Sequence, residues 1–130
     1  MGNAQSLLTM NREAGEDLSS AQYLFVTGAT DGQVEIAGAA DVLLGILQDN
    51  NASSAGDPCL VAIGGVSKLV VDGNAAAIAV GDPLAADSAG KGVKTTTDKD
   101  DYGAIALEAS TAAGDIISVL VTPGQLVSAS

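Results

Sequence analysis

The sequence predicts an all-β fold, either a small β-sandwich or a small β-barrel, with at most short helical turns. Three observations lead to this prediction. From Gln22 onward, apolar runs of strand length alternate with Gly, Asp, Asn and Ser. A Gly-Asp pair precedes three of these runs, at Gly56-Asp57, Gly81-Asp82 and Gly114-Asp115. Hydrophobic residues make up 47% of the chain but aromatic residues only 2%, so we expect a thin, aliphatic core.

The N-terminal segment differs from the rest of the chain. Residues 1–20 are mixed and polar, and we interpret them as an N-terminal arm or extension, with residues 21–130 forming a single β-rich domain. Leu7, Leu8 and Met10 are the cluster of large apolar side chains in this arm. The segment could form one or two helical turns or an extended arm. It is either a frayed terminus or a segment that orders on a partner, with Leu7 and Leu8 as anchors.

The first expected structure in the domain is a hairpin between residues 23–27 and 33–36. The strict alternation in Gln33-Val34-Glu35-Ile36 places Val34 and Ile36 on one face of a strand, and the segment from Gly28 to Gly32 supplies the turn. A strand over residues 42–47 is expected next, closed by a polar loop over residues 48–56.

Each Gly-Asp pair is interpreted as a turn into a new strand. Glycine accepts a positive φ without a Cβ clash, and an aspartate side chain can bond to the backbone two residues further on. Pro58 and Pro83 suit the first residue of a strand, where a missing N–H costs no ladder bond. The strands expected here and beyond cover residues 58–63, 66–71, 83–86, 104–108 and 116–121. The alanine-rich stretch over residues 74–79 could be one helical turn.

The segment from Ser88 to Gly92 is predicted to be a hairpin tip between strands at 84–86 and 93–95. Gly90-Lys91 resembles the end of a phosphate-binding loop. However, the required earlier glycine position holds Ala85, and Gly92 stands where Ser or Thr should follow the lysine. A nucleotide site is therefore not expected.

The residue types needed for most catalytic sites are missing. The chain has no His, which removes Ser-His-Asp and Cys-His nucleophile systems and imidazole metal sites. Cys59 is the only cysteine, so an intrachain disulfide and a multi-cysteine zinc site are excluded, and its apolar surroundings indicate a buried hydrophobe. A pair of carboxylates could in principle cleave glycosides, but three aromatic residues leave little to build a sugar cleft. We predict no enzymatic activity and no cofactor.

Charge narrows the range of partners. Lys and Arg number 5 and Asp and Glu number 16, which gives a formal net charge of −11 and argues against nucleic-acid binding and anionic membranes. Neither a membrane-spanning run nor a secretory signal is visible. Asp98, Asp100 and Asp101 suggest a calcium loop. However, Tyr102 and Ala109 occupy its fifth and twelfth positions, so a solvated acidic loop is favoured and adventitious Ca²⁺ or Mg²⁺ stays open.

From Gly45 onward, the ordered series of glycines and apolar runs resembles the head-decoration, or capsid cement, proteins of tailed phages. The segments that carry this resemblance are Gly45-Ile46-Leu47, Ala55-Gly56-Asp57, the run from Leu60 to Val66, the run from Ala79 to Leu84, the run from Gly90 to Val93, the run from Gly103 to Ala109 and the run from Ala113 to Val121. The first 44 residues align little with that pattern.

The resemblance implies a compact β-rich domain that binds the outside of the expanded capsid and reinforces it without catalysis. Its partner would be the major capsid protein, and it would bind as a homotrimer at three-fold positions. It would be made in the host cytoplasm and would lie on the exterior of the virion. In some members an N-terminal arm pairs with the capsid protein, so Leu7, Leu8, Met10 and Arg12 are the candidate capsid contacts.

Two other functions stay open. One is a β-sandwich adhesion or carbohydrate-binding module of a phage tail or cell surface, which the few aromatic residues disfavour. The other is a structural subunit of another viral part, such as a tail tube or a baseplate.

Overall fold

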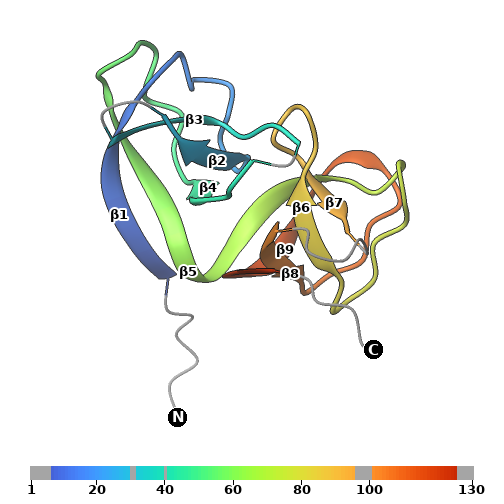
Figure 1. Cartoon of the computed structure of the whole chain (residues 1–130). Coiled ribbons are helices and arrows are strands. Elements are labelled where there is room, and N and C mark those ends of the chain that lie inside the picture. Colours follow the sequence, from blue (N-terminus) through green and yellow to red (C-terminus); the bar gives the residue numbers. More distant parts are fainter. Residues whose placement is uncertain (1–6, 30–31, 40, 96–100, 126–130) are drawn as a thin grey trace.

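The computed structural model describes residues 7–29, 32–39, 41–95 and 101–125 (Figure 1). These residues form nine strands and no α-helix, which confirms the predicted all-β class. In chain order the strands are β1 (Leu7–Ala14), β2 (Phe25–Gly28), β3 (Gln33–Ile36), β4 (Gly45–Leu47), β5 (Pro58–Asp72), β6 (Pro83–Ala86), β7 (Gly92–Lys94), β8 (Asp101–Ala106) and β9 (Ala113–Gln125).

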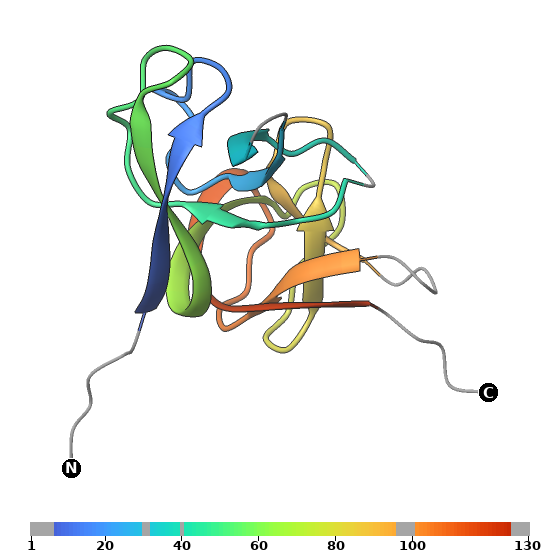
Figure 2. The ribbon, with the colours of Figure 1, turned by 60° about the vertical axis from the view of Figure 1, so that its left-hand side comes forward.

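The strand pairings close into two rings that share β5. In the first ring β1 is followed by β3, β2, β4 and β5, and β5 pairs back onto β1. In the second ring β5 is followed by β7, β6, β8 and β9, and β9 pairs back onto β5. Figures 1 and 2 show the two rings beside each other, with β5 passing from one to the other. Closing a sheet on itself removes most of its free edges, which suits a chain built from short strands.

β5 is one 15-residue strand where the sequence predicts two, over residues 58–63 and 66–71. Gly64 and Gly65 lie between the two expected runs but do not end the strand. Gly65 has a φ of 88°, and the register against β1 shifts between Leu8 and Thr9. This irregularity is a β-bulge, which bends a strand without ending its pairing. The first half of β5 therefore belongs to one ring and the second half to the other, as the bend in Figure 1 shows.

The core consists of two buried clusters, separated by a wall that β2, β4 and β5 form. Successive residues of a strand point to opposite faces. Phe25 and Ile46 accordingly lie in the larger cluster. Their neighbours along the chain, Val26 and Leu47, lie in the smaller cluster. Both faces of this wall are buried, which explains its nearly continuous apolar sequence.

The described part of the proposed arm belongs to the sheet. Residues 7–14 are extended rather than helical and pair with β5 along their length. Ala14 and Leu18 are fully buried in the smaller cluster, beside Val61 of β5. Residues 7–20 are thus continuous with the domain in structure. The division into an arm over residues 1–20 and a domain over residues 21–130 stays a prediction.

The structure agrees with some of the other local predictions and differs from others. The first hairpin is confirmed, with Val26 opposite Ile36, and so is the second, with Ala86 opposite Gly92. The strand expected over 42–47 begins only at Gly45, although Leu44 N–H still donates to the Val26 carbonyl of β2 at 2.9 Å. Residues 74–79 form no helical turn. Asp72 instead accepts hydrogen bonds from the first N–H groups of this stretch, and Ile78 pairs with Ser110.

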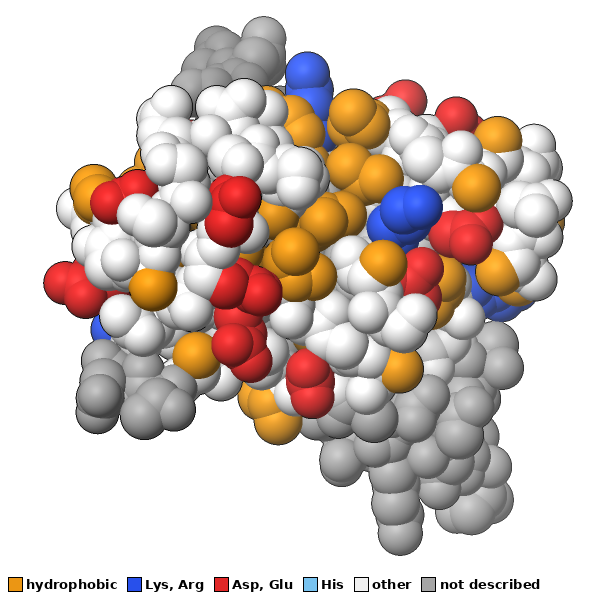
Figure 3. Space-filling view, turned by 90° about the horizontal axis from the view of Figure 1, so that it is seen from above, with side chains coloured by type: hydrophobic (Ala, Val, Ile, Leu, Met, Phe, Trp, Pro, Cys, Tyr) orange, Lys and Arg blue, Asp and Glu red, His pale blue; other side chains and the backbone are white. Residues whose placement is uncertain are grey.

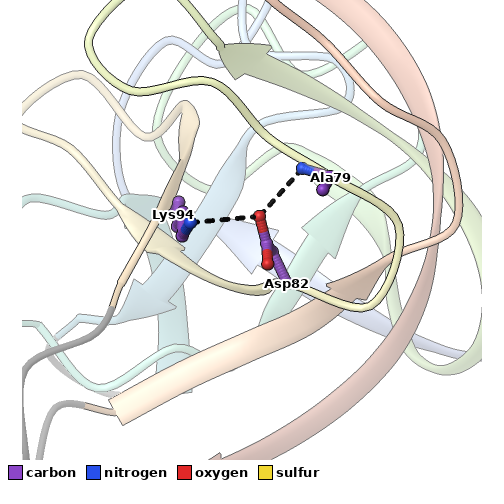
Figure 4. Close-up of polar contacts among 3 residues, drawn as sticks. All are labelled: Ala79, Asp82 and Lys94. Carbon is purple, nitrogen blue, oxygen red and sulfur yellow. Dashed lines mark hydrogen bonds and ion pairs between the residues drawn. The ribbon is translucent and has the colours of Figure 1, made fainter.

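Gly56-Asp57 and Gly81-Asp82 form turns, as predicted. Gly114-Asp115 does not, because it lies inside β9, where the register against β5 shifts in a β-bulge. Gly56, Gly81 and Gly114 have φ values of 93°, 94° and 84°, and no atom lies within 4 Å of a Cβ built on them, so the positive φ alone requires glycine. The aspartate side chains bond to backbone groups that precede them in the chain, whereas the sequence predicts bonds to groups that follow. Asp57 and Asp82 accept from N–H groups three residues earlier, at 3.2 Å and 2.8 Å, rather than from groups that follow. Figure 4 shows Asp82 between Ala79 N–H and the Lys94 ammonium, which lies 3.7 Å away.

Gly45 tests the close packing of β4 against β5. A Cβ at this position would collide with the Ala62 carbonyl oxygen and lie 2.7 Å from Val61 Cγ1. We expect Gly45→Ala to lower the free energy of unfolding by about 1–3 kcal/mol, because backbone cannot move aside as a flexible side chain would. Gly28→Ala in β2 is the matched control, since nothing lies within 4 Å of its Cβ. Equal stability of the two variants in denaturant unfolding would contradict this account of the packing.

Candidate interaction surface

Among the described residues, no group of three or more His, Cys, Asp or Glu side chains could hold a metal ion. Within the same residues, no helix is long and apolar enough to cross a membrane. The acidic loop over residues 98–101 lies outside the described residues, apart from the backbone of Asp101 at the start of β8.

Cys59 is a core residue, as the sequence predicts. It lies in β5 and packs in the smaller cluster with Val61 and Leu47. Burial raises the pKa of its thiol, and the nearby Asp49 carboxylate raises that pKa further. Both effects favour the protonated thiol, which is a poor nucleophile. The structure therefore gives Cys59 no reactive role.

The outer edge of β1 is open. Ala14 N–H donates to the Asp57 carbonyl and Ala14 C=O accepts from Gly56 N–H, both at 2.8 Å, so the backbone groups of Ala14 face the β5 side. Gly15 N–H donates to the Val34 carbonyl at 2.7 Å, on the β3 side.

Because successive backbone groups alternate, those of Thr9 and Asn11 point away from β5. β3 pairs with β1 only at Glu13 and Ala14, so no described strand covers this edge between Leu7 and Arg12.

The four candidate contact residues all lie on β1, but they are not equivalent. Leu7, Leu8 and Arg12 are exposed, and Leu8 keeps 62% of its surface accessible. Met10 is half-buried and packs against the smaller core cluster, so its first role is structural. Arg12 borders an open hollow of about 410 Å³ that Asn11, Glu13, Gly32 and Pro58 also line. The structure thus brings three of the four to the surface beside the open edge.

A second apolar surface lies on the other ring and was not predicted. Ile116 and Leu120 of β9 are exposed by 54% and 40%, on the face of the sheet that points away from the core. The run from Ile116 to Val121 is nearly continuous in hydrophobicity. Such a run is typical of a strand buried on both faces, so it gave no signal that one face is open.

Acidic side chains are not evenly spread over the face seen from above (Figure 3). On the side seen from above in Figure 3, hydrophobic side chains gather across the middle of the face and Asp and Glu side chains line one flank of them. Lys and Arg side chains on this side are few, as the net charge of −11 leads us to expect. The surface therefore combines apolar areas with a strong surplus of negative charge.

Comparison with known proteins indicates what such a chain belongs to. The family described as phage cement protein matches residues 4–123, which is nearly the whole chain. No curated protein matches the sequence. A solved structure, that of the head fiber gp8.5 N base in bacteriophage phi29, is similar in fold with a TM-score of 0.65 at 15% identity. The similarity covers 90% of this chain and 95% of that one.

The buried state of Cys59 can be tested by thiol labelling. We expect a thiol reagent to label the unfolded chain rapidly and the native chain only at the rate of unfolding. The raised pKa also predicts a pH effect. Below the ordinary thiol pKa the thiol is protonated in both the folded and the unfolded chain, and the stability that Cys59 contributes is fully present. As the pH rises from the ordinary pKa through the raised one, the unfolded chain ionises first, so the free energy of unfolding falls. Cys59→Ala should lack this alkaline loss, and rapid labelling of the native protein would contradict the buried placement.

Proposed function

This chain belongs to the phage cement protein family, and we propose that it binds the outer surface of the expanded phage capsid and stabilises it, with the major capsid protein as its partner. The observation that carries the proposal is the family match, which includes β1 and almost all of the β-rich domain. The likeness in fold to a head fiber base supports a structural role in the virion. The proposed role needs no catalytic step.

The open edge of β1 supplies a means of binding. Unpaired N–H and C=O groups along a strand edge can take up an extended segment of another chain by main-chain hydrogen bonding. The groups of Thr9 and Asn11 point to that edge, and Leu7 and Leu8 lie beside it as apolar anchors. Arg12 adds a positive charge at the same edge. We therefore propose β1 as the contact with the capsid protein.

Many copies on one shell fit the charge of the chain. A net charge of −11 keeps free copies soluble through mutual repulsion. Individually weak contacts become tight when several copies are joined and bind a repeating lattice, because the later contacts are intramolecular. We propose homotrimers at three-fold positions as the assembly that uses this effect, formed after synthesis in the host cytoplasm and located on the capsid exterior.

The direct test mixes the purified protein with expanded heads that lack it. We expect the protein to cosediment with the heads and to raise the temperature at which they break open. A protein that binds no head but binds glycans on an array would overturn the proposal in favour of an adhesion or carbohydrate-binding module.

Two variants test whether β1 makes the contact. Asn11→Pro removes an N–H that points to the open edge and leaves the β1–β5 ladder intact, since proline is tolerated where the missing donor faces away from the sheet. Leu8→Ser removes an exposed anchor, and each variant should weaken head binding by about tenfold or more. Val80→Ser is the matched control, because Val80 is exposed by 66% and lies far along the chain in the turn before β6. If all three variants bind heads like the unmodified protein, the contact lies elsewhere.

A further inference from the structure

The outer face of the three-stranded unit β5–β9–β8 is apolar, and no other described strand covers it. Inward-pointing residues such as Leu69, Ile117 and Val119 belong to the larger core cluster. The residues that alternate with them point outward, and the register places them side by side. Val70 lies opposite Ile116, Val66 opposite Leu120, and Leu120 opposite Ile105 of β8.

Several large side chains of this outer face are exposed, while Val66, Val70 and Ile105 are half-buried. Ile116 and Leu120 remain 54% and 40% accessible, and Leu107, just after β8, remains 41% accessible. Large branched side chains gathered on one sheet face mark a surface that another molecule covers. A hollow of about 250 Å³ lies at the β5 border of the face, where Val66, Lys68 and Ser118 meet residues from outside it. This hollow is also lined by Leu7, Tyr23, Gln48 and Ser67.

The charge of the outer face differs from that of the rest of the chain. Lys68 lies at its centre, exposed and opposite Ser118. Glu108 lies at its β8 side, where its Oε1 accepts a hydrogen bond from Ser118 N–H at 2.6 Å. Asp72 lies only at the far end of the face, where it accepts a hydrogen bond from Asn74 N–H. Asp115 lies opposite the inward-pointing Val71, on the other side of the sheet, and accepts a hydrogen bond from Ser110 Oγ. The middle of the face therefore carries one positive and one negative side chain.

We propose that a second copy of this chain covers the outer face of β5–β9–β8. This inference rests on the homo-oligomer in the proposed function and names the surface that forms it. Two chains with a net charge of −11 repel each other where acidic surfaces meet. On this face apolar side chains meet instead, and the Lys68 ammonium of one copy can pair with the Glu108 carboxylate of the next. The face is thus self-complementary in both hydrophobicity and charge.

The position of the face also suits the proposed capsid contact. Gly65 of β5 is paired with both Leu7 of β1 and Val121 of β9, so the outer face begins where the open edge of β1 begins. Leu7 borders both surfaces, whereas the backbone groups of Thr9 and Asn11 point away from β5 and stay free when copies join through this face. One assembly can then present several edges to the capsid at once.

Sedimentation velocity of the full chain across the micromolar range tests the inference. We expect the unmodified protein to be oligomeric, and Ile116→Ser to raise the dissociation constant by about tenfold or more. Val42→Ser is the matched control, because Val42 is exposed by 71% and lies outside this face. Circular dichroism confirms that each variant is folded. Charge exchange gives a second readout: Lys68→Glu should dissociate the oligomer, and adding Glu108→Lys should restore it.

The possible outcomes separate this inference from the proposed function. A monomeric unmodified protein, or an oligomer that neither Ile116→Ser nor Lys68→Glu weakens, would overturn the inference even if the protein binds heads. An oligomer that is weakened by Ile116→Ser but not by Val42→Ser supports it, even if no head is bound, and in that case only the capsid proposal fails.

Discussion

The bend in β5 is the constraint on which the rest of the structure depends. One strand serves as a wall of both rings, so its direction must change at Gly64-Gly65 while its neighbours stay paired. Gly65 permits this change because its φ of 88° would be strained in a residue with a side chain. The β-bulge opposite β1 accommodates the one extra residue of β5. Because Leu7 and Val121 both pair with Gly65, the bend also joins the open edge of β1 to the outer face of β9.

The turns could be predicted from the sequence because their chemistry is local. A positive φ at Gly56 and Gly81 depends on the absence of a Cβ at that residue, which the sequence states directly. Gly114 also has a positive φ, but it forms a bulge inside β9 rather than the predicted turn. The continuity of β5 could not be predicted in the same way. Gly64-Gly65 has the local character of a turn, but its pairing with β1 and β9, far away in sequence, keeps both residues within one strand. The continuity of β5, which organises the fold, therefore depends on pairing between residues far apart in the sequence.

The candidate site could likewise be predicted only in part. Leu7 and Leu8 stood out as apolar residues in a polar segment, and both are exposed on β1. Met10 has the same hydrophobic character, yet it packs against the core, because which face of a strand is buried depends on what lies against it. The outer face of β5–β9–β8 was not foreseen, since the apolar run from Ile116 to Val121 looks the same whether one face or both are covered.

The central claim is that this member of the phage cement protein family contacts the capsid through the open edge of β1. Electron cryomicroscopy of expanded heads decorated with the protein measures this directly. The account predicts a strand of the major capsid protein beside Thr9 and Asn11, extending the sheet, with β8 and β9 turned toward neighbouring copies. Density that shows β1 facing solvent, with the capsid bound to another part of the domain, would contradict it.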